Sequence, residues 1–67
     1  MKSVIKVGNM RTIQDVGVIR NAIANNEGVL ACQVNKEKQE VDVVYDTYFV
    51  TLEDLIASLE DMGYTVL

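Results

Sequence analysis

Two Thr-x-x-Asp motifs, each placed directly before a stretch of helically spaced apolar residues, constrain the fold of this chain most. Thr12 and Asp15 form the first motif, and Thr51 and Asp54 form the second. In a capping box, a threonine hydroxyl accepts from a backbone N–H three residues later while an acidic side chain there reaches back. Aspartate makes a weaker version of this cap than glutamate. The motifs predict two helices that begin just after residues 12 and 51.

Each predicted helix carries one apolar stripe along its length. The first stripe comprises Ile13, Val16, Ile19, Ala22 and Ile23, and the second comprises Leu52, Leu55, Ile56, Leu59 and Met62. Gly17 interrupts the first helix at a cost of roughly 1 kcal/mol relative to alanine, so we expect it to permit close packing. Residues 25–28 and Gly63 favour helix ends.

Alternating apolar residues predict strands over residues 2–7, 29–35, 40–46 and 64–67. The side chains expected to face the core are Ile5 and Val7, then Leu30, Cys32 and Val34, then Val41, Val43 and Tyr45. Residues 36–39 are polar and short enough for a hairpin between the second and third strands.

The predicted element order is βαββαβ, within a single domain over residues 1–67. Two amphipathic helices need one apolar surface to cover, and an antiparallel sheet offers one. Right-handed connections then give an α+β, ferredoxin-like sandwich, with a four-stranded antiparallel sheet and two helices on one face. The opposite sheet face, including Val4, Lys6, Ala31, Gln33, Asp42 and Val44, is expected to be solvated.

The charge and composition exclude several classes of function. The net charge is −4, with 10 acidic and 6 basic residues. This balance opposes binding to nucleic acid or to an anionic membrane, and leaves a basic protein or a cation as the electrostatically acceptable partner. The chain has no histidine and no plausible nucleophile–base pair, so we expect no enzyme activity. A lone cysteine and the lack of a long apolar run predict a cytoplasmic protein without membrane insertion.

Five segments are informative together: Gly28-Val29, Val34-Asn35, residues 41–46, Leu55-Ile56 and residues 60–66. With these segments at this spacing, the chain resembles the heavy-metal-associated domain, the fold of small copper chaperones and of N-terminal modules of metal-transporting P-type ATPases. The resemblance covers nearly the whole chain and implies the same sandwich.

In that family the first loop reads Gly-Met-x-Cys-x-x-Cys, and its two thiolates bind Cu(I) or another soft ion. Sulfur is required because soft ions prefer thiolate, and the helix start lowers the thiol pKa. Here Met10 matches the methionine, while Thr12 and Asp15 stand at the cysteine positions. The resemblance therefore identifies Met10, Thr12 and Asp15 as the metal-loop positions. Their mixed donors give little reason to hold a soft ion tightly, and Thr12 and Asp15 read instead as a helix cap.

Two further residues, Cys32 and Tyr64, bear on whether the chain binds a metal. Cys32 is expected to be a buried core thiol far from the first loop, because its strand phase matches Leu30 and Val34. A reactive thiol or an intermolecular disulfide at Cys32 is the alternative. Tyr64 matches an aromatic residue that lies near the metal loop in bacterial chaperones of the family.

The hypothesis we favour is a heavy-metal-associated domain with a degenerate site, serving as a protein-interaction or structural module without a cofactor. The alternative is a carrier of copper or another heavy metal that uses a nonstandard or dimer-completed site. The partner would be a metal-transporting ATPase or another protein docking on the first loop and helices, and the chain would be a monomer or weak homodimer. A small-molecule sensor with Gly8-Asn9 in a ligand loop is supported by topology alone.

Overall fold

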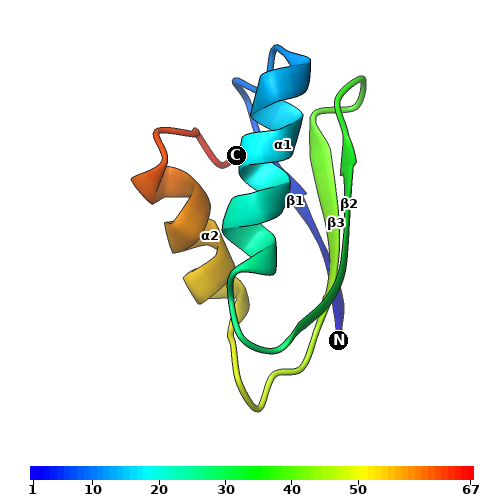
Figure 1. Ribbon diagram of the computed structural model, residues 1–67, viewed down its shortest axis with the longest axis vertical. Coiled ribbons are helices and arrows are strands. Elements are labelled where there is room, and N and C mark those ends of the chain that lie inside the picture. Colours follow the sequence, from blue (N-terminus) through cyan, green and yellow to red (C-terminus); the bar gives the residue numbers. More distant parts are fainter.

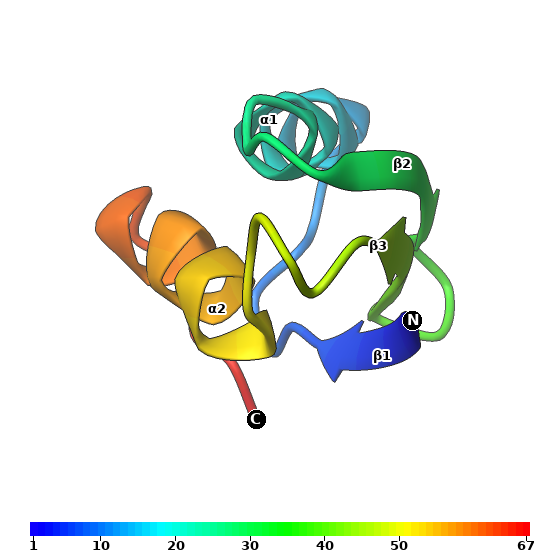
Figure 2. The same cartoon turned by 90° about the horizontal axis from the view of Figure 1, so that it is seen from below.

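The computed structural model describes residues 1–67, and its five regular elements form two layers (Figure 1). The elements are β1 (Lys2–Lys6), α1 (Ile13–Ala24), β2 (Val29–Asn35), β3 (Glu40–Tyr45) and α2 (Leu52–Asp61). Seen from below, both helices cover the same side of the strands, so the other sheet face is open (Figure 2). Neither helix is long and apolar enough to cross a membrane.

The sheet has three strands in the order β1-β3-β2, and both pairs are antiparallel. The prediction of four strands is wrong in this detail, because residues 64–67 form only an isolated bridge between Val66 and Val7. The Gly8 amide donates to the Thr65 carbonyl (2.8 Å), and the Leu67 amide donates to the Lys6 carbonyl (2.9 Å). Gly8 turns the chain away just after Val7, so the pairing cannot extend into a ladder.

The core lies between the sheet and the two helices. The alternation predicted for β3 is confirmed, since its inward residues are almost fully buried while the residues between them are only partly so. The buried residues are Ile5, Val7, Met10, Ile19, Ile23, Val41, Val43, Tyr45, Val50, Leu55 and Leu59. No buried side-chain polar atom lacks a hydrogen-bond partner, so the core carries no unpaired polar group.

Both predicted capping boxes are present. Thr12 Oγ1 accepts from the Asp15 amide (3.1 Å), and Asp15 Oδ2 accepts from the Thr12 amide (3.0 Å). Thr51 and Asp54 make the same pair of bonds at 3.2 and 3.0 Å. Each threonine cap is worth about 1 kcal/mol of stability, and an acidic side chain in the first turn also suits the helix dipole.

Three residues expected to face the core are exposed instead. Ile13 is 83% exposed, because at about 100° per residue it lies about 120° around α1 from Ile19. Met62 lies beyond the last residue of α2 as its C-cap and is also exposed. Leu30 is 72% exposed because the register of β2 against β3 shifts between Val29 and Ala31. Such a bulge reverses the alternation on one side of the shift.

The two glycines at residues 17 and 28 meet different surroundings. A Cβ atom on Gly17 would have no heavy atom within 4 Å, so the expectation that Gly17 permits close packing is wrong. Gly28 has a φ of +95°, and a Cβ atom there would lie 2.7 Å from Phe49 Cβ. The Gly28 carbonyl also accepts from the Asp46 amide (2.8 Å). Gly28 therefore allows the loop after β3 to pack closely against the start of β2.

We expect Gly28→Ala to lower the free energy of unfolding by about 2 kcal/mol or more, because the substitution adds backbone strain to a steric clash. Urea denaturation followed by circular dichroism measures the change.

The matched control is Gly17→Ala, which adds the same methyl group in open space. It is expected to raise the free energy of unfolding by about 0.5–1 kcal/mol through helix propensity. Equal effects at the two positions would contradict this account of Gly28.

Candidate functional site

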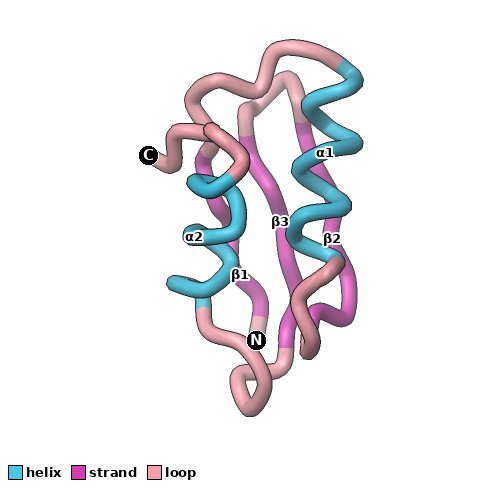
Figure 3. Tube along the Cα trace, turned by 60° about the vertical axis from the view of Figure 1, so that its left-hand side comes forward, coloured by secondary structure: helices cyan, strands magenta, loops and turns pink.

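The first loop, residues 8–12, joins β1 to α1 at one end of the sandwich. The β2–β3 hairpin and the segment after α2 approach the same end (Figure 3). The structure brings Met10, Thr12, Asp15 and Tyr64 together here, so four of the five site residues named from the sequence lie at one place.

The carboxylate of Asp15 is the centre of this site, and both of its oxygens accept hydrogen bonds. Oδ2 accepts from the backbone amides of Arg11 (2.9 Å) and Thr12 (3.0 Å). Oδ1 accepts from the hydroxyl of Tyr64 at 2.7 Å, a length typical of a strong bond to a charged acceptor. The carboxylate therefore joins the start of α1 to the segment that follows α2.

This network shifts both pKa values. The hydrogen bond from Tyr64, followed by those from the Arg11 and Thr12 amides, lowers the pKa of Asp15 to about 2. Burial, followed by the bond to Asp15, raises the pKa of Tyr64 to about 12. Asp15 is therefore charged and Tyr64 is neutral across the whole physiological range, so the bond between them persists there.

Met10 is buried, with 1% of its surface exposed, and belongs to the hydrophobic core. Its backbone is fixed by the side chain of Gln39, whose Oε1 accepts from the Met10 amide (3.1 Å) and whose Nε2 donates to the Met10 carbonyl. Gln39 itself has a φ of +56° at the end of the hairpin. The Met10 side chain thus anchors the loop to the core and does not present its sulfur to the surface.

Asn9 and Gln39 are the loop-holding residues that the sequence analysis missed. Asn9 Oδ1 accepts from the Thr65 amide (2.8 Å), and Asn9 Nδ2 donates to the Gly63 carbonyl (3.2 Å). A turn preference was the only sequence signal at Asn9, and Gln39 carried none. The bonds of Asn9 and Gln39 join residues that are far apart in the sequence, so no local sequence pattern indicates them.

Cys32 does not join the site. It lies in the middle of β2, paired with Val43, and is partly rather than fully buried where it packs against the core. Burial raises the pKa of its thiol, which keeps the thiol protonated and weakens it as a nucleophile or ligand. No group of three or more histidine, cysteine, aspartate or glutamate side chains is placed to hold a metal ion.

Replacing Tyr64 by phenylalanine is expected to raise the pKa of Asp15 from about 2 toward 3.8, because it removes the bond that contributes most to the shift. An NMR titration of the Asp15 carboxyl carbon measures the pKa directly. The matched control is Tyr45→Phe, which removes a hydroxyl bonded to Ser3 instead. An unchanged Asp15 pKa in Tyr64→Phe would contradict the proposed role of the phenol.

The depressed pKa also predicts a contribution to acid stability. A carboxyl group whose pKa is lowered by folding stabilises the fold fully above its unfolded pKa, and this contribution is lost as the pH falls through the folded pKa. For Asp15 this window runs from about pH 4 to about pH 2. Asp15→Asn is expected to show a flatter pH dependence of the free energy of unfolding in that window, which urea denaturation at a series of pH values measures.

Comparison with known proteins supports the same fold. The copper chaperone CopZ of Bacillus subtilis is 32% identical over 62 residues, which cover 92% of this chain and 90% of the relative. The solved structure of a CopZ metallochaperone superposes with a TM-score of 0.97 at 28% identity, with full coverage of both chains. A copper-binding domain from HMA7, a P-type ATPase, gives a TM-score of 0.94 at 27% identity, covering 98% of this chain and 89% of that domain.

The family assignment rests on both sequence and structure. The sequence model of the heavy-metal-associated domain matches residues 4–65, and the relatives extend across nearly the whole chain. They are named as copper chaperones rather than as enzymes. This chain belongs to the heavy-metal-associated domain family, as a small copper-chaperone-like protein.

Proposed function

We propose that this protein is a heavy-metal-associated domain whose first loop no longer binds a soft metal tightly, and whose role is protein interaction or structural. It acts without a cofactor and is not an enzyme. The relatives are named copper chaperones, so the question for this loop is whether its residues can bind copper as Cu(I).

The observation that carries the proposal is the hydrogen bonding of Asp15. Its two oxygens already accept from Arg11, Thr12 and Tyr64, which occupy three of the about four lone-pair positions of the carboxylate and leave it little capacity to bind a cation. A carboxylate and a hydroxyl are also hard donors, which a soft monovalent ion does not favour. The residues present therefore do not fit a tight Cu(I) site.

Neither the Met10 thioether nor the Cys32 thiol supplies the soft ligand that the first loop lacks. Met10 would have to leave the core to offer its thioether. Cys32 lies within β2, and burial keeps its thiol protonated. The replacement of two thiolates by Thr12 and Asp15 exchanges a ligand pair for a helix cap worth about 1 kcal/mol.

The interaction role draws on what the fold retains around the first loop. Ile13 is strongly exposed, and Arg11, two residues before it, is exposed as well, so this end of the fold offers an apolar and a cationic side chain. The structurally similar domain from HMA7 belongs to a P-type ATPase. A metal-transporting ATPase, or another protein that docks on the first loop and the helices, is the partner that we propose for this end.

The second candidate is metal transport by a nonstandard site or by one completed across two copies of the chain. The copper-chaperone relatives favour it. In that case two Cys32 thiols from separate copies, or a rearranged Met10, would have to supply the sulfur ligands.

An anaerobic Cu(I) titration against a competing chelator distinguishes the two candidates. Thr12→Cys/Asp15→Cys is expected to compete with the chelator at one Cu(I) per chain, because the pair of thiolates at a helix start suits a soft ion. The natural chain is expected not to compete under the same conditions.

Both chains are also measured with Cys32→Ser, which isolates the first loop from the only natural thiol. Tight, stoichiometric binding by the natural chain that survives Cys32→Ser would overturn the proposal. Binding that disappears with Cys32→Ser and is accompanied by a dimer in native mass spectrometry would favour the second candidate.

A further inference from the structure

Two aromatic rings stand exposed at the end of the sandwich opposite the first loop. Tyr48 is 86% exposed and Phe49 is 55% exposed, in the loop between β3 and α2. Their ring centroids lie 5.1 Å apart in an edge-to-face arrangement. In Figure 1 this loop lies at the lower end and the first loop at the upper end. Neither residue belongs to the hydrophobic core, and two adjacent exposed rings are a feature of binding surfaces.

The loop that carries the rings is held in one conformation by Asp46. Asp46 Oδ1 accepts from the Tyr48 amide (2.9 Å), and the Asp46 carbonyl accepts from the amides of Phe49 (3.1 Å) and Val50 (3.2 Å). Val50 is buried in the core, and Gly28 packs against Phe49. The aromatic side chains are therefore presented on a preorganised backbone, which lowers the entropy lost when a partner binds.

Two further exposed apolar side chains belong to the segments at this end of the sandwich. Leu30, which the bulge in β2 turns outward, follows two residues after Gly28, the residue that contacts Phe49. Met1 lies beside Tyr45, because its carbonyl accepts from the Tyr45 amide, and Met1 is also strongly exposed. Tyr and Phe on a rigid loop with aliphatic neighbours have the composition of an interface centre.

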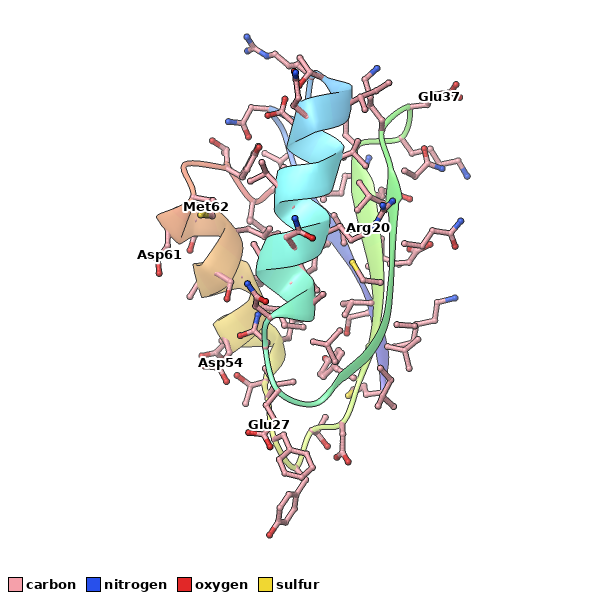
Figure 4. All side chains as sticks on the ribbon, viewed as in Figure 1. Arg20, Glu27, Glu37, Asp54, Asp61 and Met62 are labelled. Atoms are coloured by element: carbon pink, nitrogen blue, oxygen red, sulfur yellow. The ribbon has the colours of Figure 1, made fainter.

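Acidic side chains surround this apolar surface. Glu27 precedes Gly28, Asp46 begins the loop, and Glu53 lies in the first turn of α2, all of them exposed. Figure 4 shows Glu27 at the lower end of the molecule and Asp54 just above it. The positive groups at this end are the N-terminal ammonium, which donates to a backbone carbonyl, and Lys2 on strand β1. From residue 39 to the last residue, the chain has no lysine or arginine at all.

We propose that this surface, the aromatic pole (Tyr48, Phe49 and Leu30 with the rim of Glu27, Asp46 and Glu53), docks a cationic segment of another protein. The segment carries arginine and an apolar side chain. Arginine stacks on an exposed ring and pairs with a rim carboxylate, while the apolar side chain packs against Leu30 and Phe49. The inference gives the proposed interaction role a surface and a partner chemistry, and in that respect rests on it.

The rim charges select this occupant over two others. An anionic membrane would be repelled by the carboxylates around the rings. A second copy would bring another acidic pole or a chain of net charge −4, and like charges oppose that approach. A cationic protein segment is the partner whose charge complements the pole.

An NMR titration of the full-length chain with a defined probe tests the proposal. The probe is a short peptide in which arginine alternates with leucine, and the control peptide has glutamate in place of arginine. We expect saturable amide shifts confined to residues 27–30 and 46–54 with the arginine peptide only. Raising the salt from about 50 to about 500 mM should weaken binding, because the rim is exposed to solvent.

Four variants make the test specific to the pole. Tyr48→Ser/Phe49→Ser is expected to weaken peptide binding by at least about tenfold, because residues at the centre of an interface supply most of its binding energy. Glu27→Gln/Glu53→Gln should weaken binding and flatten its salt dependence. The matched control, Val4→Ser, removes an exposed apolar side chain from the open face of the sheet and should bind as the natural chain does. Tyr48→Ser alone guards against misfolding, because Tyr48 supports no core contact.

Several outcomes would overturn the proposal. These are equal binding of the glutamate peptide, shifts centred on the first loop, and unchanged binding by the aromatic variant. Self-association in sedimentation, or binding to zwitterionic vesicles, would also overturn it if the aromatic variant abolished either, because a second copy or a membrane would then occupy the pole. The Cu(I) titration reports on the first loop alone, so failure at the pole remains distinguishable from failure of the proposed loss of metal binding.

Discussion

The bond between Tyr64 and Asp15 joins the two ends of the chain's regular structure, and the first loop depends on it. It links the first turn of α1 to the segment that bridges β1 through Val66. Since Asp15 also caps α1 through Thr12, a single carboxylate sets the helix start and closes the end of the sandwich. Asn9 and Gln39 support this arrangement by tying the loop backbone to the final segment and to the hairpin. Polar contacts therefore hold this end of the sandwich together with the buried side chain of Met10.

The same helix start suits two different kinds of chemistry. Unpaired backbone amides and the helix dipole favour a negative group there, whether thiolate or carboxylate. A thiolate keeps its charge available to a soft ion, whereas the Asp15 carboxylate distributes its charge among amides and a phenol. With a carboxylate at the helix start, the favourable interaction of the negative charge with the helix stabilises the fold. Little of that charge then remains available to a ligand. The carboxylate at the start of α1 is thus held by hydrogen bonds within the fold, in a chain that superposes closely on a CopZ metallochaperone.

Local patterns predicted most of the fold and part of the site. The caps at Thr12 and Thr51 and the alternation in β3 depend on neighbours within a few residues, so the sequence shows them. The outward turn of Leu30 depends on a register shift between two strands, and the single bridge at Val66 depends on where β1 turns. The resemblance located Met10, Asp15 and Tyr64 as a group. The bonds from Asn9 and Gln39 join segments far apart in the chain, and composition carries no signal for them.

The two ends of the molecule differ in a way that bears on how it meets a partner. At the first loop the polar groups are mutually satisfied and Met10 is buried, so mainly Ile13 and Arg11 are left to engage another surface. At the aromatic pole the backbone is equally fixed by Asp46, but the rings of Tyr48 and Phe49 are exposed and the carboxylates of Glu27 and Glu53 make no hydrogen bond within the fold. A loop that is already ordered and carries unpaired side chains favours association, because the conformational entropy of the loop was lost during folding and is not lost again on binding. The end of the molecule opposite the first loop is therefore the one whose exposed side chains are better suited to binding another protein.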